Sequence, residues 1–418
     1  PKLKIVLLNE KDDFPQLSES SCFLIVKVES KNENLNYAII QFPDKFERFI
    51  VIKNQEGKYV IMIDDIIRYH LFEIFKIFNP LNIVANMIKF SRDAELDFDD
   101  DISKSYLEKI SQSVKDRLKG DPLRFVYDKE IDPNTLKFLL EKMNINSEID
   151  SVIPGGKYHN KKDYMNFPVL NNDLAYDKIE HLVIKDFYKH KTVFKSIDER
   201  DFLVHTPFHK FNHILTFLSE ASIDPDVKRI CITIYRLSKL SSVANTLINA
   251  AKNGKEVVVQ IELQARFDET NNIDYAKLMQ DQGVKLIFGI PTLKVHAKVC
   301  VVEKLIKNKI LKYGFISTGN FNESTAKIYT DFTIFTSNQS LLDEISNVFE
   351  FFNFNYKKFK YEKLIISPYN TKKFFKSLIK NEIKNAQRGK DAFIKIKLNN
   401  ITNYEMVEEL YKAAEEGV

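Results

Sequence analysis

Alternating apolar and polar positions predict strands and helices along most of the chain. Near its start, residues 21–30 (SCFLIVKVES) and 46–54 (FERFIVIKN) have the short apolar runs and β-branched content of strands. Residues 103–119 predict an amphipathic helix, because apolar side chains recur there at helical spacing along one face. We therefore expect the first part of the chain to mix strands and helices.

From about residue 183 the pattern becomes a regular succession of strands and helices. Gly254 and Gly283 end the two helical patterns, and glycine most readily takes the backbone conformation needed at a helix C-terminus. Strands that alternate with helices of this length predict a mixed or parallel α/β sheet. The predicted strands are 227–237, 255–267 and 284–290, and the predicted helices are 241–254 and 272–283.

A short internal similarity links residues 230–255 with residues 393–418. Both have a strand-like run, a polar turn and a helical pattern that closes with the letters AAxxG, at Gly254 and at Gly417. Chance is the alternative for so short a match. If the similarity is real, a second copy of the α/β unit begins near residue 393, and its own histidine segment lies beyond Val418.

Composition and charge indicate ordinary globular domains. The chain has 418 residues, more than one core usually holds, so two or three domains are expected. Apolar residues make up 44%, charged residues 29%, and the net charge is only +4. A site for anions must therefore be created locally, by a few side chains, and not by the charge of the whole surface.

Cysteine use and the absence of long apolar runs bear on the compartment. Cys22, Cys231 and Cys300 lie far apart without a CxxC pair, which excludes a disulfide framework and suits a reducing compartment. No apolar run approaches the roughly 18 residues of a membrane span, and the first residues do not resemble a signal peptide. We expect a cytoplasmic protein, with peripheral association with a membrane as an open alternative.

The segment 292–304 (TLKVHAKVCVVEK) carries the first candidate chemistry. Strand alternation predicts Lys294, His296 and Lys298 on one face and apolar side chains on the other. Three cationic or titratable groups on a largely buried strand are costly unless an anion meets them. This favours a phosphate-handling site, and a structural histidine in a half-buried strand is the alternative.

Two arginines follow predicted strands of the same sheet. Arg236 and Arg266 stand at the carboxyl ends of strands, where ligands of parallel α/β sheets gather. A guanidinium group matches phosphate oxygens in a bidentate manner. Positions 236, 266 and 296 are spaced 30 residues apart, about one strand–helix repeat, so we expect Arg236, Arg266 and His296 at one sheet edge. Surface salt bridges are the alternative for either arginine alone.

Several weaker signals have a plain structural alternative. Asn320 and Asn322, in STGNFN (317–322), could donate to phosphate oxygens, although turns commonly contain such residues. The acidic run 97–101 could hold a metal, but a solvated helix start explains it as well. The aromatic and basic run 351–363 could meet nucleic acid, or could be helix surface. The glycine-containing loop 151–168 could face an anion or could be ordinary surface, and its candidates are Lys157, His159, Lys161 and Lys162.

Together these segments resemble a known family. HAK at 296–298 followed by TGNFN is similar to the HxK…GxN half-site of the phospholipase D superfamily. Glu303 stands where that superfamily has an aspartate, so a hydrolase is a poorer fit. The segments ITIYRLSK, VVQIELQARFDE, LKVHAK, STGNFNESTAKIYTDF and SRDAELD resemble bacterial polyphosphate kinase of the phospholipase-D-like type, over essentially the whole chain.

The resemblance implies reversible transfer of the ATP γ-phosphate to polyphosphate through a phosphohistidine on His296, with Lys298 beside it. It implies that Arg236 and Arg266 occupy magnesium-site positions, where we expect them to act through phosphate, because guanidinium offers no acceptor to a cation. It implies that Tyr329 contacts the nucleotide. Mg²⁺ is the implied cofactor, ATP or ADP and inorganic polyphosphate are the implied partners, and no nucleic acid is expected.

The resemblance also implies a domain layout. Residues 1–182 are expected to form an α+β head-like domain, and residues 183–363 a phospholipase-D-like catalytic domain with a mixed sheet. Residues 364–418 are expected to begin a second such domain. A second histidine and an ATP-contacting arginine are expected beyond Val418, and a helical domain before Pro1, so the chain is expected to lack part of the active site.

A homo-oligomer, dimer or tetramer, is expected as well. Two other functions stay open. One is a different phosphodiesterase or transferase of the phospholipase D superfamily. The other is an inactive fragment that binds polyphosphate.

Overall fold

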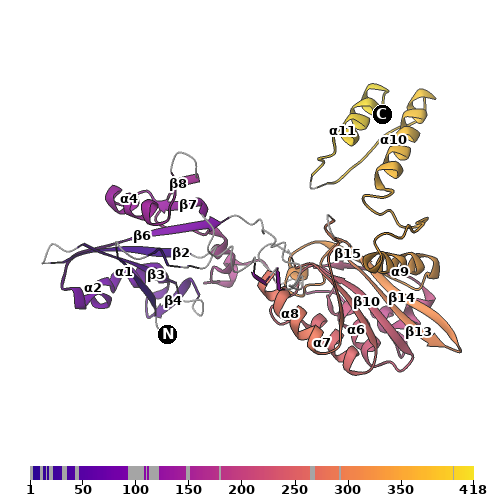
Figure 1. Ribbon diagram of the computed structural model, residues 1–418, viewed down its shortest axis with the longest axis horizontal. Coiled ribbons are helices and arrows are strands. Elements are labelled where there is room, and N and C mark those ends of the chain that lie inside the picture. Colours follow the sequence, from indigo (N-terminus) through magenta and orange to yellow (C-terminus); the bar gives the residue numbers. More distant parts are fainter. Residues whose placement is uncertain are drawn as a thin grey trace. The chain divides into compact units, whose positions relative to one another are not determined.

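In the computed structural model the chain forms two compact units, Pro1–Ile179 and Glu180–Val418 (Figure 1). No helix among the described residues is both long and apolar enough to cross a membrane. The structure describes residues 3–9, 13–15, 17, 22–30, 35–42, 47–92, 108–109, 111–112, 122–146, 151–177, 180–263, 269–290, 293–398 and 400–418.

The first unit is built on a six-stranded sheet in the order β1-β3-β2-β6-β7-β8, with a separate β4-β5 hairpin. All neighbouring strands of the large sheet are antiparallel except β7 and β8, which are parallel. The strands are β1 (Lys4–Leu8), β2 (Cys22–Ser30), β3 (Leu35–Gln41), β4 (Phe49–Asn54), β5 (Gly57–Met62), β6 (Pro80–Arg92), β7 (Pro122–Asp128) and β8 (Ser151–Gly155).

Strand β2 is buried on both sides, which explains its continuous apolar run. Phe23 and Ile25 belong to a core that includes Leu139 of α4 (Pro133–Lys142). Leu24 and Val26 face a second core that includes residues of α1 (Ile63–Tyr69) and α2 (Leu71–Ile74). The strands predicted at 21–30 and 46–54 are confirmed as β2 and β4.

Two other predictions in the first unit have different outcomes. The predicted loop 151–168 is wrong in its first part, because residues 151–155 pair with β7 as the parallel strand β8. The same segment then forms the 3₁₀ helix η2 (Lys161–Asn166). The acidic run 97–101 and most of the predicted helix 103–119 lie outside the described residues.

The second unit contains a mixed seven-stranded sheet in the order β12-β11-β10-β13-β14-β15-β9. Strands β10, β11 and β12 are parallel, and all other neighbours are antiparallel, which confirms the predicted α/β fold with a mixed sheet. The strands are β9 (Phe202–Thr206), β10 (Val227–Ile234), β11 (Glu256–Ile261), β12 (Lys285–Phe288), β13 (Val299–Ile306), β14 (Lys309–Ser317) and β15 (Asp331–Thr336).

Helices cover both faces of this sheet (Figure 1). Helices α6 (Asn212–Ile223), α7 (Ser242–Lys252) and α8 (Glu269–Asp281) lie on one face, and α9 (Gln339–Asn353) lies on the other. The two glycines predicted to end α7 and α8 have φ values of 79° and 83°, as that position requires. A β-carbon at Gly314 would lie 2.6 Å from the side chain of Leu342, so glycine there lets α9 approach the sheet.

The residues after α9 form helices α10 (Thr371–Gln387) and α11 (Tyr404–Glu415). Lys372 and Lys376 of α10 form ion pairs with Glu405 of α11. The helix and the glycine of the internal similarity are present, since Gly417 follows α11 with a φ of 90°. Its strand-like run 393–398 belongs to no described strand, because it pairs with no neighbouring strand in the described part of the chain.

Candidate active site

The candidate residues meet at one edge of the seven-stranded sheet. Arg236 lies two residues beyond the end of β10, while His296 and Lys298 immediately precede β13. Strand β13 runs antiparallel beside β10, so its start lies next to the end of β10. The residues that follow Ser317, the last of β14, emerge at the same edge.

The strand predicted over 292–304 is wrong in its first half, because β13 begins at Val299. The chain arrives from β12, on the far side of β11, and pairs with β10 only from that point. Thr233 of β10 fixes the junction: its hydroxyl donates to the Ala297 carbonyl at 2.7 Å and accepts from the Val299 amide at 3.0 Å. His296 is therefore not at the end of a third parallel repeat, as the 30-residue spacing predicted.

The predicted alternation of faces across this segment is also wrong. Lys294 and His296 are exposed, whereas Lys298 is buried. The Lys298 ammonium group donates to the backbone carbonyl of His296 at 2.6 Å, so the lysine bends back under the histidine. The three side chains nevertheless gather at one place, since each approaches the same tyrosine.

Tyr235, which the sequence did not single out, is the centre of this group. The His296 ring meets the Tyr235 ring edge-on, with centroids 4.9 Å apart and planes at 80°. The Lys298 and Lys294 nitrogens lie 5.2 and 5.8 Å from the Tyr235 centroid, and the Arg236 guanidinium carbon lies 5.6 Å from it. The negative face of an aromatic ring attracts cations, so Tyr235 stabilises three positive charges close together.

The cluster shifts the pKa values of its own members. Partial burial of its ring, together with the charges of Lys298, Lys294 and Arg236, lowers the pKa of His296 below its usual value, which favours a neutral imidazole at pH 7. Burial, joined by the charge of Arg236 and opposed by Asp331, lowers the pKa of Lys298 to about 8. Shifts of this kind, at a sheet edge with gathered cations, are typical of functional sites.

The segment 317–323 (STGNFNE) is held mainly by structural contacts. A β-carbon at Gly319 would lie 2.3 Å from the Asp331 carboxylate, so only glycine fits beside it. The Thr318 hydroxyl donates to that carboxylate at 2.8 Å. Phe321 is buried and its ring packs edge-on against Phe315 of β14, with centroids 5.1 Å apart. These contacts fix the segment beside the start of β13.

The two predicted asparagines differ in what they can offer. The Asn322 side-chain oxygen accepts from the Ser324 and Thr325 amides, at 3.0 and 3.1 Å, and so starts the 3₁₀ helix η5 (Thr325–Lys327). Asn320 has a buried side-chain oxygen with no hydrogen-bond partner among the described residues. A flip of the amide group would place its nitrogen where the oxygen now lies, and that nitrogen could donate to a phosphate oxygen. Of the two asparagines, Asn320 is therefore the one whose side chain is available to a ligand.

Comparison with known proteins identifies the family. Models of polyphosphate kinase domains match the chain in order: the middle domain at residues 1–167, C-terminal domain 1 at 192–358 and C-terminal domain 2 at 364–418. The chain belongs to the polyphosphate kinase family.

Individual relatives agree with this. A polyphosphate kinase of Vibrio parahaemolyticus is 40% identical over 425 residues, covering 100% of this chain and 61% of that protein. One from Escherichia coli strain K12 is 38% identical over 99% of this chain and 61% of its own length. The crystal structure of polyphosphate kinase from Porphyromonas gingivalis matches 100% of this chain and 63% of its own, with a TM-score of 0.74 and 27% identity. The chain thus spans about three-fifths of these relatives.

The remaining residues predicted for a polyphosphate kinase site have varied positions. Tyr329 lies two residues before β15, whose first residues are at the same sheet edge as the end of β14. Tyr329 is 62% exposed. Arg266 lies outside the described residues. Lys157, Lys161 and Lys162 belong to the first unit. Among the described residues, no three histidine, cysteine, aspartate or glutamate side chains come close enough to hold a metal ion.

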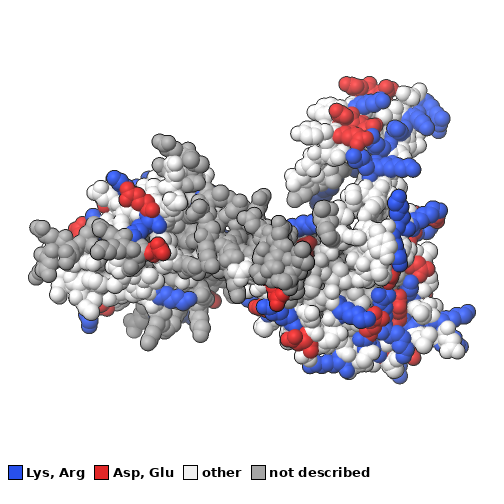
Figure 2. Space-filling model, in the orientation of Figure 1, with Lys and Arg blue, Asp and Glu red and all other residues white. Residues whose placement is uncertain are grey.

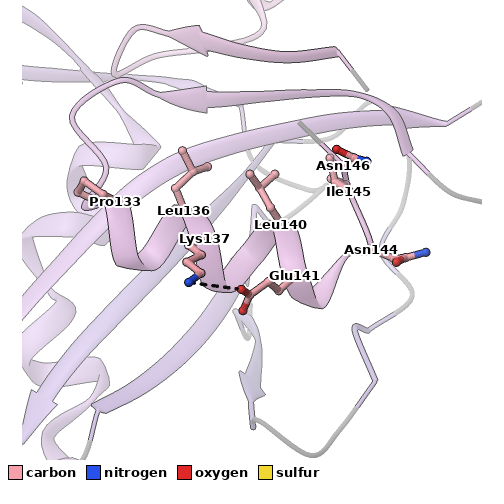
Figure 3. Close-up of a pocket in the computed structure, with 8 residues that line it drawn as sticks. All are labelled: Pro133, Leu136, Lys137, Leu140, Glu141, Asn144, Ile145 and Asn146. Atoms are coloured by element: carbon pink, nitrogen blue, oxygen red, sulfur yellow. Dashed lines mark ion pairs between the residues drawn. The ribbon is translucent and has the colours of Figure 1, made fainter. Parts of the chain in front are cut away.

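Neither the charge distribution on the visible surface nor the pocket beside α4 includes a concentration of the predicted site residues. Lysine, arginine, aspartate and glutamate side chains of both signs are interspersed on the visible face of each unit in Figure 2. A pocket of about 660 Å³ beside α4 is lined by eight residues, which include three aliphatic side chains and Lys137, paired with Glu141 at 3.9 Å (Figure 3). The gathering of positively charged side chains around Tyr235 is therefore a local feature of the second unit.

Proposed function

We propose that this chain carries the histidine half-site of a polyphosphate kinase, an ATP:polyphosphate phosphotransferase, and that His296 takes up the γ-phosphoryl group of ATP. The observation that supports this best is an imidazole of lowered pKa grouped with Lys294, Lys298 and Arg236 around Tyr235. A neutral imidazole can act as a nucleophile, and the surrounding cations suit a polyanionic substrate.

The proposed reaction has two transfers. A ring nitrogen of His296 attacks the γ-phosphorus, a P–N bond forms, and the P–O bond to ADP breaks with its electron pair going to the ADP oxygen. A terminal oxygen of polyphosphate then attacks the same phosphorus, and the P–N bond returns its electrons to the imidazole. Attack by ADP in the second step reverses the reaction. Covalent transfer of this kind divides one difficult step into two easier ones.

The cations of the cluster would stabilise the charge that moves during transfer. The phosphoryl group is nearly metaphosphate-like in the transition state, so positioning and charge neutralisation supply most of the catalysis. Lys298 and Arg236 are close enough to His296 to lower its pKa, and we assign them to the phosphoryl oxygens. We expect Asn320 and Arg266 to add donors there, and Asn322 only through its amide nitrogen.

Several further parts of the proposal rest on family resemblance. Mg²⁺ would enter with ATP, held by phosphate oxygens, which suits an edge lined by cations. Tyr329 would contact the nucleotide, and Lys294 would line a path for polyphosphate at the sheet edge. Lys161 and Lys162 of the first unit are separate candidates for binding polyphosphate, whereas Lys157 there is paired with Asp65. The domain limits at residues 182 and 363, a dimer or tetramer, and a cytoplasmic location with peripheral membrane contact remain proposals too.

The central test is transfer of label from γ-labelled ATP in the presence of Mg²⁺. We expect the chain to acquire an acid-labile, base-stable label, because phosphohistidine has that stability. In His296→Ala the label should fall to background, since the attacking nitrogen is gone. Measuring protein-bound label after acid and after base treatment checks the prediction.

A matched control and the rival functions give the other outcomes. Asp343→Ala removes an exposed ion pair with Lys312 near the opposite end of β14 and should label normally. An unlabelled chain that cleaves phosphodiesters would support a phosphodiesterase of the phospholipase D type. A folded chain that does neither, yet binds polyphosphate, would support a binding fragment.

A further inference from the structure

Glu323 joins the two segments that bring the candidate residues to the sheet edge. One oxygen of its carboxylate accepts from the Ser242 and Val243 amides at 2.7 and 3.1 Å, at the first turn of α7. The other oxygen accepts from the Ser238 hydroxyl at 2.7 Å. The end of the STGNFNE segment is thus bound to the loop between β10 and α7. We call residues 235–243 the Arg236 loop.

The Arg236 loop is held from its other side by α8. Asn272 is fully buried, and its amide nitrogen donates to the Tyr235 carbonyl at 2.9 Å and to the Glu262 carbonyl at 2.9 Å. Its side-chain oxygen accepts from the Leu237 amide at 3.3 Å. Asn272 therefore holds the backbone on both sides of Arg236, and Glu323 closes the loop a few residues later.

The Glu323 carboxylate also occupies a place where phosphate could otherwise bind. The first turn of a helix presents amide groups without intrahelical partners, and its positive dipole attracts anions. In α7 a carboxylate already fills that place. A phosphate at this edge would therefore meet the side-chain cations around Tyr235, because the helix end is taken.

We propose that Glu323 is a positioning residue for phosphate binding, which acts by holding the Arg236 loop so that Arg236 and Tyr235 stay beside His296. This inference rests on the proposed function. It assigns Glu323 no contact with the substrate. The alternative is that Glu323 only stabilises the start of α7, in which case its loss would weaken the fold without acting through Arg236.

A double-mutant cycle separates the two roles. Tripolyphosphate affinity is measured by calorimetry for the full 418-residue chain and for Arg236→Ala, Glu323→Ala and the double variant. We expect each single change to weaken binding about tenfold, and the double variant to bind no more weakly than Arg236→Ala, because the loop has nothing left to position. Additive losses would overturn the proposal, as would the absence of tripolyphosphate binding by the unchanged chain.

Glu344 provides a matched control. It is a buried carboxylate, 8% exposed, and like Glu323 it accepts from backbone amides, here those of Glu362, Lys363 and Leu364, away from the sheet edge. Glu344→Ala should lower the melting temperature and leave tripolyphosphate affinity within twofold of the unchanged chain, roughly the resolution of such comparisons. A loss of affinity equal to that of Glu323→Ala would contradict the assignment.

A conservative variant guards against failure to fold. Glu323→Gln retains an oxygen for the α7 amides, and should bind more tightly than Glu323→Ala; it replaces alanine in the cycle if the alanine variant unfolds. Tripolyphosphate binding requires no phosphoryl transfer. A chain that binds tripolyphosphate but takes no label from ATP would overturn the proposed function, and the cycle would still decide the role of Glu323.

Discussion

Buried cations have opposite surroundings in the first unit and at the sheet edge of the second unit. In the first unit Arg48, whose side chain is 10% exposed, lies 2.6 Å from each of two carboxylates, Asp64 and Asp163. At the sheet edge of the second unit, no carboxylate within the described ranges forms an ion pair with Lys298, although that lysine is 6% exposed. Burial without a paired charge is costly for a lysine.

The difference also appears in the pKa values of two lysines. Burial acts to lower the pKa of Lys157 in the first unit, but its contacts with Asp65 and Tyr158 outweigh burial and raise it. At the sheet edge, burial dominates and the pKa of Lys298 falls to about 8. A paired cation stabilises the fold, whereas Lys298 has no carboxylate at ion-pair distance in the described part of the chain and only the charge of Asp331 acts to raise its pKa. Under the proposed function, its charge is available to a phosphate.

The largest effects on ligand binding and on stability are expected when Lys298, which has no ion pair with a described residue, is replaced. Lys298→Met keeps the unbranched stem and removes the charge. We expect tripolyphosphate affinity and His296 labelling to fall by roughly 100-fold, as for loss of a buried charged donor. The same change should stabilise the fold at pH 7 by roughly 1–3 kcal/mol, because it removes a charge that burial disfavours. Calorimetric titration and chemical unfolding measure the two effects.

Lys304, in strand β13 that directly follows Lys298, is the matched control for Lys298. It is 7% exposed, but its ammonium group lies 2.6 Å from the Asp224 carboxylate. Lys304→Met should therefore destabilise the fold, since it leaves a carboxylate unpaired, and should not change tripolyphosphate affinity. If the two methionine variants changed stability and tripolyphosphate affinity equally, the distinction between paired and unpaired buried lysines would be wrong.

The pH dependence of the Lys298 effects has a defined sign. The folded pKa is lowered from 10.5 to about 8, so the unfolded chain binds more protons between these values. Stability relative to Lys298→Met is lowest below pH 8 and recovers as pH rises towards 10.5. Tripolyphosphate affinity should fall as pH rises through about 8, because the lysine then loses its charge.

Changes at Tyr235 test whether the ring gathers the cluster. Tyr235→Leu removes the edge contact with His296 and the attraction for the nearby cations, and we expect His296 labelling to fall about tenfold. Tyr235→Phe keeps the ring and should stay within about threefold of the unchanged chain, since it keeps the cation–π contacts. Labelling rates at saturating and low ATP measure both kcat and KM. If phenylalanine were as harmful as leucine, the hydroxyl group would matter and not the ring.

Local sequence signals predicted much of the fold, but few of the contacts between the residues of the site. The repeats up to β12 were predictable because each strand, helix and closing glycine depends on neighbouring residues, as at Gly254. The antiparallel orientation of β13 could not be predicted in this way, because it depends on pairing with β10, which is distant in the chain. Arg236, His296 and Lys298 were identified and do meet. Tyr235 was missed because an aromatic residue at a strand end is usually core.

The roles within the STGNFNE segment show the same limit. Asn322 was expected to donate to phosphate, yet its oxygen starts a turn two and three residues later, a local pattern that the sequence does contain. Glu323 could not be assigned from sequence, because its partners at 238–243 lie about 80 residues earlier in the chain. The sequence shows which residues have suitable functional groups. Which of these groups already form hydrogen bonds within the protein depends largely on tertiary contacts.

The smallest effect is expected for the paired lysine that the sequence placed on the polyphosphate path. The Lys157 side chain is 53% exposed and lies 3.3 Å from Asp65. Lys157→Ala should change stability by about 0.5 kcal/mol or less, since exposed ion pairs contribute little, and should leave the salt dependence of polyphosphate binding unchanged. Lys162→Ala, which removes an exposed lysine without an ion pair to any described residue, should flatten that dependence if the path includes it. A larger effect at Lys157 than at Lys162 would show that pairing does not exclude a cation from binding polyphosphate, and the distinction between the two units would then fail.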